Sequence, residues 1–173
     1  MNFEITDKIK EQDEKIIYQG LLEYNLSRIE DKNPKDLGIY LQDETGKKLA
    51  GLIGNTHGNW LQVKFLWVNE ELRGQNIGSK ILKQAEDTAK ERGCKYAFLD
   101  TFSFQAPMFY IKHGYKEVFT LEEYPVTGKR YYFTKTLVST DSSSKGNINL
   151  FWSLSVNYYV TTHLSIKVFL SLC

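Results

Sequence analysis

The sequence has little cysteine and little histidine, and these shortages exclude several classes of protein. Its 173 residues hold two cysteines, Cys94 and Cys173, and three histidines, with no pairing typical of a metal site or a redox dithiol. We therefore expect no bound metal and a reduced, cytoplasmic protein. The first residues lack the basic and apolar segments of a secretion signal. A net charge of +1 provides no basic field for a nucleic acid.

Composition divides the chain into one folded domain and a tail. Hydrophobic residues make up 42% and charged residues 25%, as in globular domains. We expect one domain over residues 1–138, then a polar, serine-rich linker to about residue 149. The apolar remainder to residue 173 is interrupted by Asn157, His163 and Lys167, so we do not expect a membrane span, and the sequence assigns this tail no role.

Hydrophobic periodicity predicts an α/β (α+β) fold with a mixed, mostly antiparallel sheet and flanking helices. Helical spacing follows Thr6 or Asp7, either of which can cap a helix, and it continues to about Ile29 as one or two helices broken near Gly20. Further helices are expected over 77–91, closed by Arg92-Gly93, and over 105–113. Strands are expected over 2–5, 38–42, 48–55, 60–68, 96–102, 115–121 and 130–137, and 60–68 and 96–102 form a parallel βαβ unit.

The segment Leu66–Leu82 organises the domain as a strand, a tight loop and a helix. Between Arg73 and Ser79 lie two glycines, an asparagine and few bulky side chains, so backbone N–H groups can converge at the start of the helix. Such a terminus favours an anion. The sequence contains neither of the two common nucleotide-binding patterns, Gly-x-x-x-x-Gly-Lys-Ser/Thr and Gly-x-Gly-x-x-Gly. Glycines of this kind can also serve only the turn itself.

Two segments together resemble the GNAT superfamily of N-acetyltransferases. Arg73-Gly74-Gln75-Asn76-Ile77-Gly78 is similar to the family's pyrophosphate loop, Arg/Gln-x-x-Gly-x-Gly/Ala, with Asn76 in place of the first motif glycine. Asparagine adopts left-handed backbone angles readily and is also a favoured helix N-cap. About 30 residues downstream, Tyr110-Ile111-Lys112-His113-Gly114-Tyr115 resembles the family's Tyr-x-x-x-Gly-Phe/Tyr segment. The resemblance covers residues 2–138.

The resemblance implies a site for acetyl-coenzyme A. Backbone groups of Leu66, Trp67 and Val68 would hold the pantetheine arm where two strands splay apart, and Gln105 would contact that arm. Tyr110 would donate a proton to the departing thiolate, because a phenol suits an acid better than a base at neutral pH. The pyrophosphate would bind at the loop, formed by Arg73, Gly74, Gln75, Asn76, Ile77, Gly78 and Ser79.

The sequence assigns no general base. Asp100 could act directly or through water, or could be merely solvated, whereas His57 and His113 lie where structural roles predominate. Cys94 is interpreted as a small buried filler.

These features predict an N-acetyltransferase that moves an acetyl group from acetyl-coenzyme A to a primary amine by direct attack in a ternary complex. The alternatives are an inactive acyl-coenzyme A sensor or interaction module, and a phosphate-loop nucleotide binder that the missing Lys-Ser/Thr pair disfavours. The expected acceptor is a small-molecule or peptide amine. By the resemblance, the helical residues before Ile29 would shape the site that binds it. A homodimer is left open.

Overall fold

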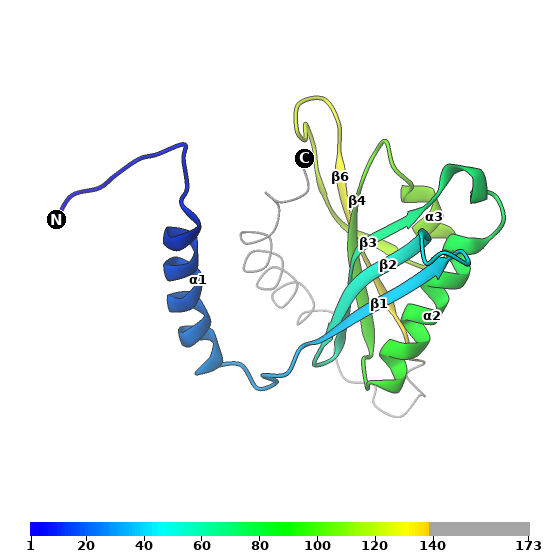
Figure 1. The fold of residues 1–173 in the computed structure, drawn as a ribbon, viewed down its shortest axis with the longest axis horizontal. Coiled ribbons are helices and arrows are strands. Elements are labelled where there is room, and N and C mark those ends of the chain that lie inside the picture. Colours follow the sequence, from blue (N-terminus) through cyan, green and yellow to red (C-terminus); the bar gives the residue numbers. More distant parts are fainter. Residues whose placement is uncertain (139–173) are drawn as a thin grey trace. The chain divides into compact units, whose positions relative to one another are not determined.

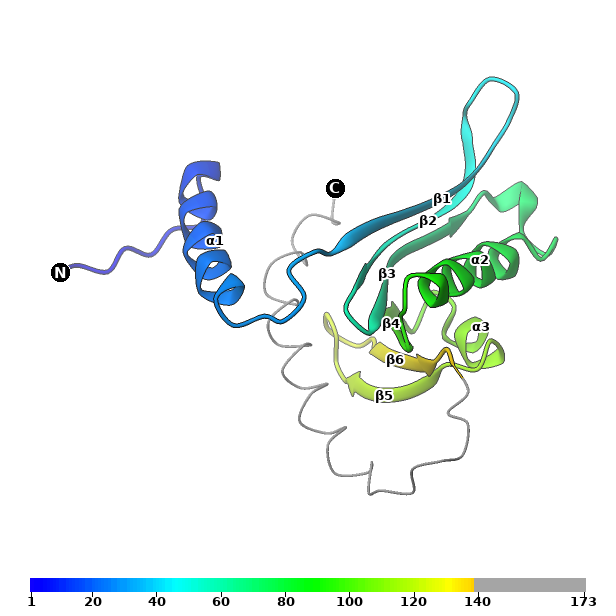
Figure 2. The ribbon, with the colours of Figure 1, turned by 90° about the horizontal axis from the view of Figure 1, so that it is seen from below.

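The computed structural model describes residues 1–138, and the predicted linker and tail, residues 139–173, lie outside the described residues. Figures 1 and 2 show the arrangement of its elements. In chain order they are α1 (Glu11–Leu26), β1 (Lys35–Gln42), β2 (Lys48–His57), β3 (Trp60–Val68), the short 3-10 helix η1 (Glu70–Leu72), α2 (Ile77–Glu91), β4 (Tyr96–Phe102), α3 (Pro107–Lys112), β5 (Lys116–Leu121) and β6 (Arg130–Thr136).

Six strands form one mixed sheet in the order β1-β2-β3-β4-β6-β5. Only β3 and β4 are parallel, while every other neighbouring pair is antiparallel. A parallel pair needs a long crossover connection, and α2 provides it. The predicted mixed sheet and its βαβ unit are therefore confirmed.

The core lies between the sheet and helices α2 and α3, which cover one face of it (Figure 2). Helix α2 buries one stripe and leaves charged residues outward, as its 3.6-residue periodicity predicts. Each buried leucine or isoleucine contributes about 1.5–3 kcal/mol relative to exposure. The stripe and its partners on the strands are Ile81, Leu82, Ala85, Ala89, Leu52, Leu61, Val63, Ala97 and Leu99.

The amino end differs from the prediction in three respects. Residues 2–5 form no strand. The helix begins at Glu11, because the Thr6 hydroxyl accepts a hydrogen bond from the Lys8 amide in a local turn and caps nothing. Helix α1 also runs unbroken through Gly20, where glycine costs only about 1 kcal/mol relative to alanine. No residue of α1 is buried.

Strand boundaries follow the prediction most closely at β3, which spans the expected 60–68. Strand β1 begins three residues earlier than expected, because Lys35 and Asp36 pair with β2 although both are charged. Charged residues are common on edge strands such as β1, so polarity conceals the start of the strand. Among residues 1–138, no helix combines the length and the apolar character needed to cross a lipid bilayer.

Candidate functional site

Strands β3 and β4 split apart where both approach the loop after β3. Their parallel pairing joins Trp60–Val63 to Tyr96–Leu99, although β3 continues to Val68 and β4 to Phe102. Strand β3 remains paired with β2 as far as Val68. The backbone groups of residues 65–67 that face β4 therefore have no partner in β4 and are available to a ligand. The predicted arm-binding residues, Leu66, Trp67 and Val68, all lie along this split.

A β-bulge accompanies the split. The register of β2 against β3 shifts at Gly54, which leaves Lys64 as the extra residue of β3. A bulge bends and twists its strand, and here it precedes the segment that parts from β4. A Cβ atom added at Gly54 would lie 2.2 Å from the carbonyl oxygen of Gln62, so the close approach of the two strands requires glycine.

The loop between β3 and α2 contains two left-handed residues. Gly74 has φ of 79°, and Asn76 has φ of 62° and ψ of 14°. The prediction that Asn76 adopts left-handed angles is confirmed. Asn76 also occupies the N-cap position, for which asparagine is favoured, although its side chain makes no capping hydrogen bond. In the left-handed region the backbone, rather than the side chain, determines what this residue contributes.

The amino terminus of α2 consequently keeps its free amides. The first backbone bond into the helix runs from the Lys80 amide to the Asn76 carbonyl, at 3.1 Å. Within the described part of the chain, the amides of Ile77, Gly78 and Ser79 have no hydrogen-bond partner. Three unsatisfied N–H groups and the positive end of the helix dipole form a site for an anion.

Side chains of the loop fold back and hold its shape. Arg73 donates from Nε to the carbonyl oxygen of Val68 at 3.2 Å, and its guanidinium lies 3.8 Å from the Glu70 carboxylate. Gln75 donates from Nε2 to the carbonyl oxygen of Glu71 at 3.2 Å. The two side chains therefore tie the loop to the end of β3 and to η1.

The two predicted motifs meet at Gly78. A Cβ atom added there would lie 3.6 Å from the Phe109 ring and 3.6 Å from a methyl group of Val68. The start of α2, the end of β3 and helix α3 therefore converge, although Phe109 lies about 30 positions after Gly78 in the sequence. The structure thus brings the loop and the Tyr110 segment to one place.

Tyr110 is buried in α3, and 8% of its surface is exposed. Its ring packs edge-on against those of Phe109 and Tyr115, with centroids 5.1 and 5.8 Å apart. Burial raises the pKa of Tyr110 to about 12, and the negative charge of Asp100 adds to the shift. The phenol therefore stays protonated at neutral pH, as a proton donor must.

Gln105 lies at the end of β4, with its amide oxygen already occupied. Oε1 accepts hydrogen bonds from the Thr101 hydroxyl at 3.0 Å and from the Phe102 amide at 2.9 Å. Only the Nε2 group is left for a ligand, and contact with the arm stays a prediction.

The other candidate residues have structural partners. His57 Nε2 lies 2.5 Å from the carbonyl oxygen of Asp31, and His113 Nδ1 lies 2.8 Å from that of Phe109. Cys94 is buried as predicted, and burial raises the pKa of its thiol. Over residues 1–138 the structure shows no group of three or more histidine, cysteine or acidic side chains placed to hold a metal.

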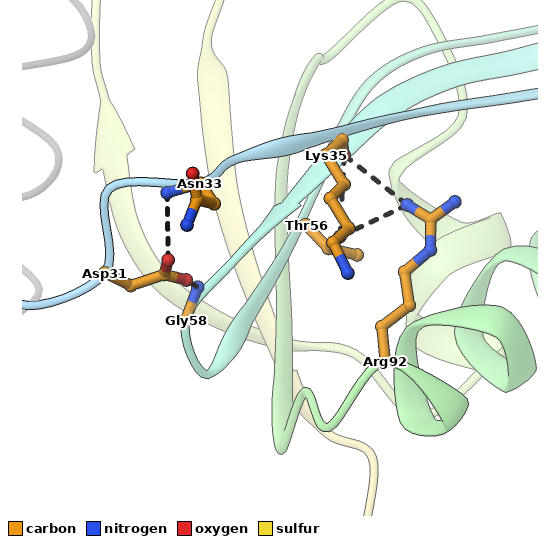
Figure 3. A pocket seen from close by; sticks show the side chains of 6 residues that line it. All are labelled: Asp31, Asn33, Lys35, Thr56, Gly58 and Arg92. Atoms are coloured by element: carbon orange, nitrogen blue, oxygen red, sulfur yellow. Dashed lines mark hydrogen bonds between the residues drawn. The ribbon is translucent and has the colours of Figure 1, made fainter.

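A pocket of about 260 Å³ lies at the opposite end of β3 and α2 from the loop (Figure 3). There Arg92 donates to the carbonyl oxygens of Lys35 and Asp36 and to the Thr56 hydroxyl. Asp31 accepts a hydrogen bond from the amide of Gly58. The Arg92 bonds tie the end of α2 to β1 and β2, and the Asp31 bond ties the segment before β1 to the β2–β3 turn. The pocket is thus a by-product of structural contacts, and it is separate from the split.

Comparison with known proteins is consistent with this geometry. The model of the Acetyltransferase (GNAT) family matches residues 4–115, a span that includes the loop and α3. An acetyltransferase of Agrobacterium fabrum is 36% identical over 121 residues, which cover 70% of this chain and 88% of that protein.

Two further proteins are similar. The blasticidin-S acetyltransferase of Streptomyces morookaense is 38% identical over 87 residues, which cover 50% of this chain and 64% of that protein. The crystal structure of an acetyltransferase from Bacillus cereus has a TM-score of 0.69 at 32% identity, and the match covers 77% of this chain and 97% of that chain.

Proposed function

Because the chain belongs to the GNAT family of acetyltransferases, we propose that it transfers the acetyl group of acetyl-coenzyme A to a primary amine by direct attack in a ternary complex. The observation that carries the proposal is the set of free amides at Ile77, Gly78 and Ser79, beside the split between β3 and β4. A diphosphate fits those amides, and an extended arm fits the split.

Each predicted residue has a defined task in this proposal. The amides of Gln75 to Ser79 bind the pyrophosphate, while Arg73 and Gly74 hold the loop in shape. Backbone groups of Leu66, Trp67 and Val68 hold the arm, and one of their amides stabilises the oxyanion of the thioester carbonyl. Gln105 donates to the arm from Nε2.

The chemical step needs no covalent enzyme intermediate, because a neutral primary amine is a sufficient nucleophile. Its nitrogen attacks the thioester carbonyl carbon, a C–N bond forms and the C–S bond breaks. Tyr110 protonates the departing sulfur, and the nitrogen then gives up one proton, which restores the Tyr110 phenol, so that a neutral amine and a thioester become an amide and a thiol. The buried phenol is suited to this task because it remains neutral at physiological pH.

We further propose a small-molecule acceptor. The relative named for blasticidin-S supports this choice over a protein acceptor. A cytoplasmic location accords with the free thiol of Cys94.

The test measures thiol release from acetyl-coenzyme A across a panel of primary amines. Tyr110→Phe should lower kcat by about 10²-fold or more, with acetyl-coenzyme A affinity unchanged by calorimetry. Tyr115→Phe is the matched control, because it removes a neighbouring buried hydroxyl from a ring that packs against that of Tyr110. Binding of acetyl-coenzyme A without turnover of any amine would instead favour a sensor, and no binding would refute the site.

A further inference from the structure

A carboxylate lies where the split opens, on the face of the sheet away from α2. Along β4, Ala97, Leu99 and Thr101 are buried toward the core, so the alternating residue Asp100 points to the other face. Leu99 is the last residue of β4 that pairs with β3. Asp100 is therefore the first residue of β4 beside the gap.

Arg130 holds this carboxylate in place. Its Nε donates to Asp100 Oδ2 at 2.7 Å, with the two side chains 11% and 35% exposed. The guanidinium carbon lies 5.2, 5.6 and 5.8 Å from the ring centroids of Phe102, Tyr124 and Tyr132. Three rings and an ion pair leave the guanidinium little freedom, so the Asp100 carboxylate has a fixed orientation.

Two polar atoms beside this pair lack partners. Asp100 Oδ1 has no hydrogen-bond partner among residues 1–138, although a carboxylate oxygen can accept two bonds. The Tyr132 hydroxyl is buried and also has no partner there, and 6% of that residue is exposed. Buried hydroxyls are nearly always hydrogen-bonded, and Tyr132 is the cross-strand partner of Asp100 in β6, on the side of β4 away from the gap.

We propose that Asp100 binds the ammonium group of the acceptor through Oδ1, with Arg130 as its positioning residue. This inference rests on the proposed function. Asp100 accepts a hydrogen bond from the acceptor nitrogen and so orients it toward the thioester, while the proton that the ammonium must lose goes to solvent.

The test compares Asp100→Asn with the wild type in the thiol-release assay, with ethanolamine, 2-phenylethylamine and putrescine as acceptors. Loss of a charge-assisted hydrogen bond should lower kcat/KM for the amines by about 10–100-fold, chiefly through KM. The affinity for acetyl-coenzyme A should stay within about twofold. Asp87→Asn is the matched control. Asp87 is ion-paired like Asp100, with two lysines in place of an arginine, but it lies on the exposed face of α2.

Asp100→Asn leaves Arg130 without its charged partner and can therefore impair folding. A second variant separates such a folding defect from a loss of amine binding. Asp100→Leu/Arg130→Leu removes both charges, and an apolar pair of similar size usually preserves stability. This double variant should fold and bind acetyl-coenzyme A, and its kcat/KM for the amines should fall by the same factor as that of Asp100→Asn. An unchanged amine KM in a folded variant would overturn the role of Asp100 alone. A wild type that releases no thiol with any amine would overturn the proposed function as well.

Discussion

The left-handed conformation of Asn76 allows a single substitution to test whether the shape of the loop matters for binding. Its side chain makes no capping bond, so its contribution is its tolerance of φ near 62°. An ordinary L-residue in this region costs about 1–2 kcal/mol, whereas glycine has no such penalty. Asn76→Ala should therefore impair the loop, and Asn76→Gly should not.

The penalty can appear in one of two places. If the free loop relaxes in Asn76→Ala, acetyl-coenzyme A must restore the left-handed form, and 1–2 kcal/mol corresponds to a Kd about 5–30-fold higher. If the fold holds the loop, the free energy of unfolding drops by about 1–2 kcal/mol instead. Calorimetric titration measures the first quantity and urea denaturation the second.

Asn76→Gly serves as the control, with binding close to that of the wild type. Stability and affinity both unchanged in Asn76→Ala would refute the reasoning, because the left-handed angle would then be unnecessary for the loop.

Three further predictions concern the packing around the site. Gly78→Ala should retain acetyl-coenzyme A binding by calorimetry, because the new Cβ makes ordinary contacts, whereas Gly54→Ala, with its Cβ 2.2 Å from a carbonyl oxygen, should lower the melting temperature through a loss of about 1–3 kcal/mol. Glu86→Leu leaves Lys135, its partner at 2.6 Å, unpaired and should cost about 3 kcal/mol in urea denaturation, while adding Lys135→Leu restores most of the loss. Since burial raises the pKa of Tyr110 to about 12, the stability from its neutral form is complete below pH 10 and falls between pH 10 and 12. Tyr110→Phe should show a smaller fall in denaturation across that range, and the buried phenols of Tyr115 and Tyr132, whose pKa values burial also raises, account for the remainder.

Local patterns in the sequence predict the elements around the loop well. Helix α2 occupies the expected residues 77–91, because its apolar stripe has helical spacing and Arg92-Gly93 stops it, with Gly93 at φ of 90°. Strand β3 likewise matches. Both signals lie within about 15 residues, so no tertiary contact is needed to interpret them.

Features that depend on distant residues could not be predicted in the same way. Arg130 and Asp100 are 30 positions apart and meet only because β6 pairs with β4. No local pattern marks that ion pair or the rings around it. The inward turn of Gln105 onto β4 is similarly decided by the backbone geometry at the end of the strand.

Helix α1 has no buried side chain, so it contributes little packing energy to the sheet. Its sequence can therefore drift during evolution without a folding penalty, whereas the loop and α2 are constrained by both the core and the ligand. If α1 shapes the acceptor side, as the family resemblance implies, new acceptor preferences can arise by exchange of this helix while the acetyl-transfer machinery stays intact.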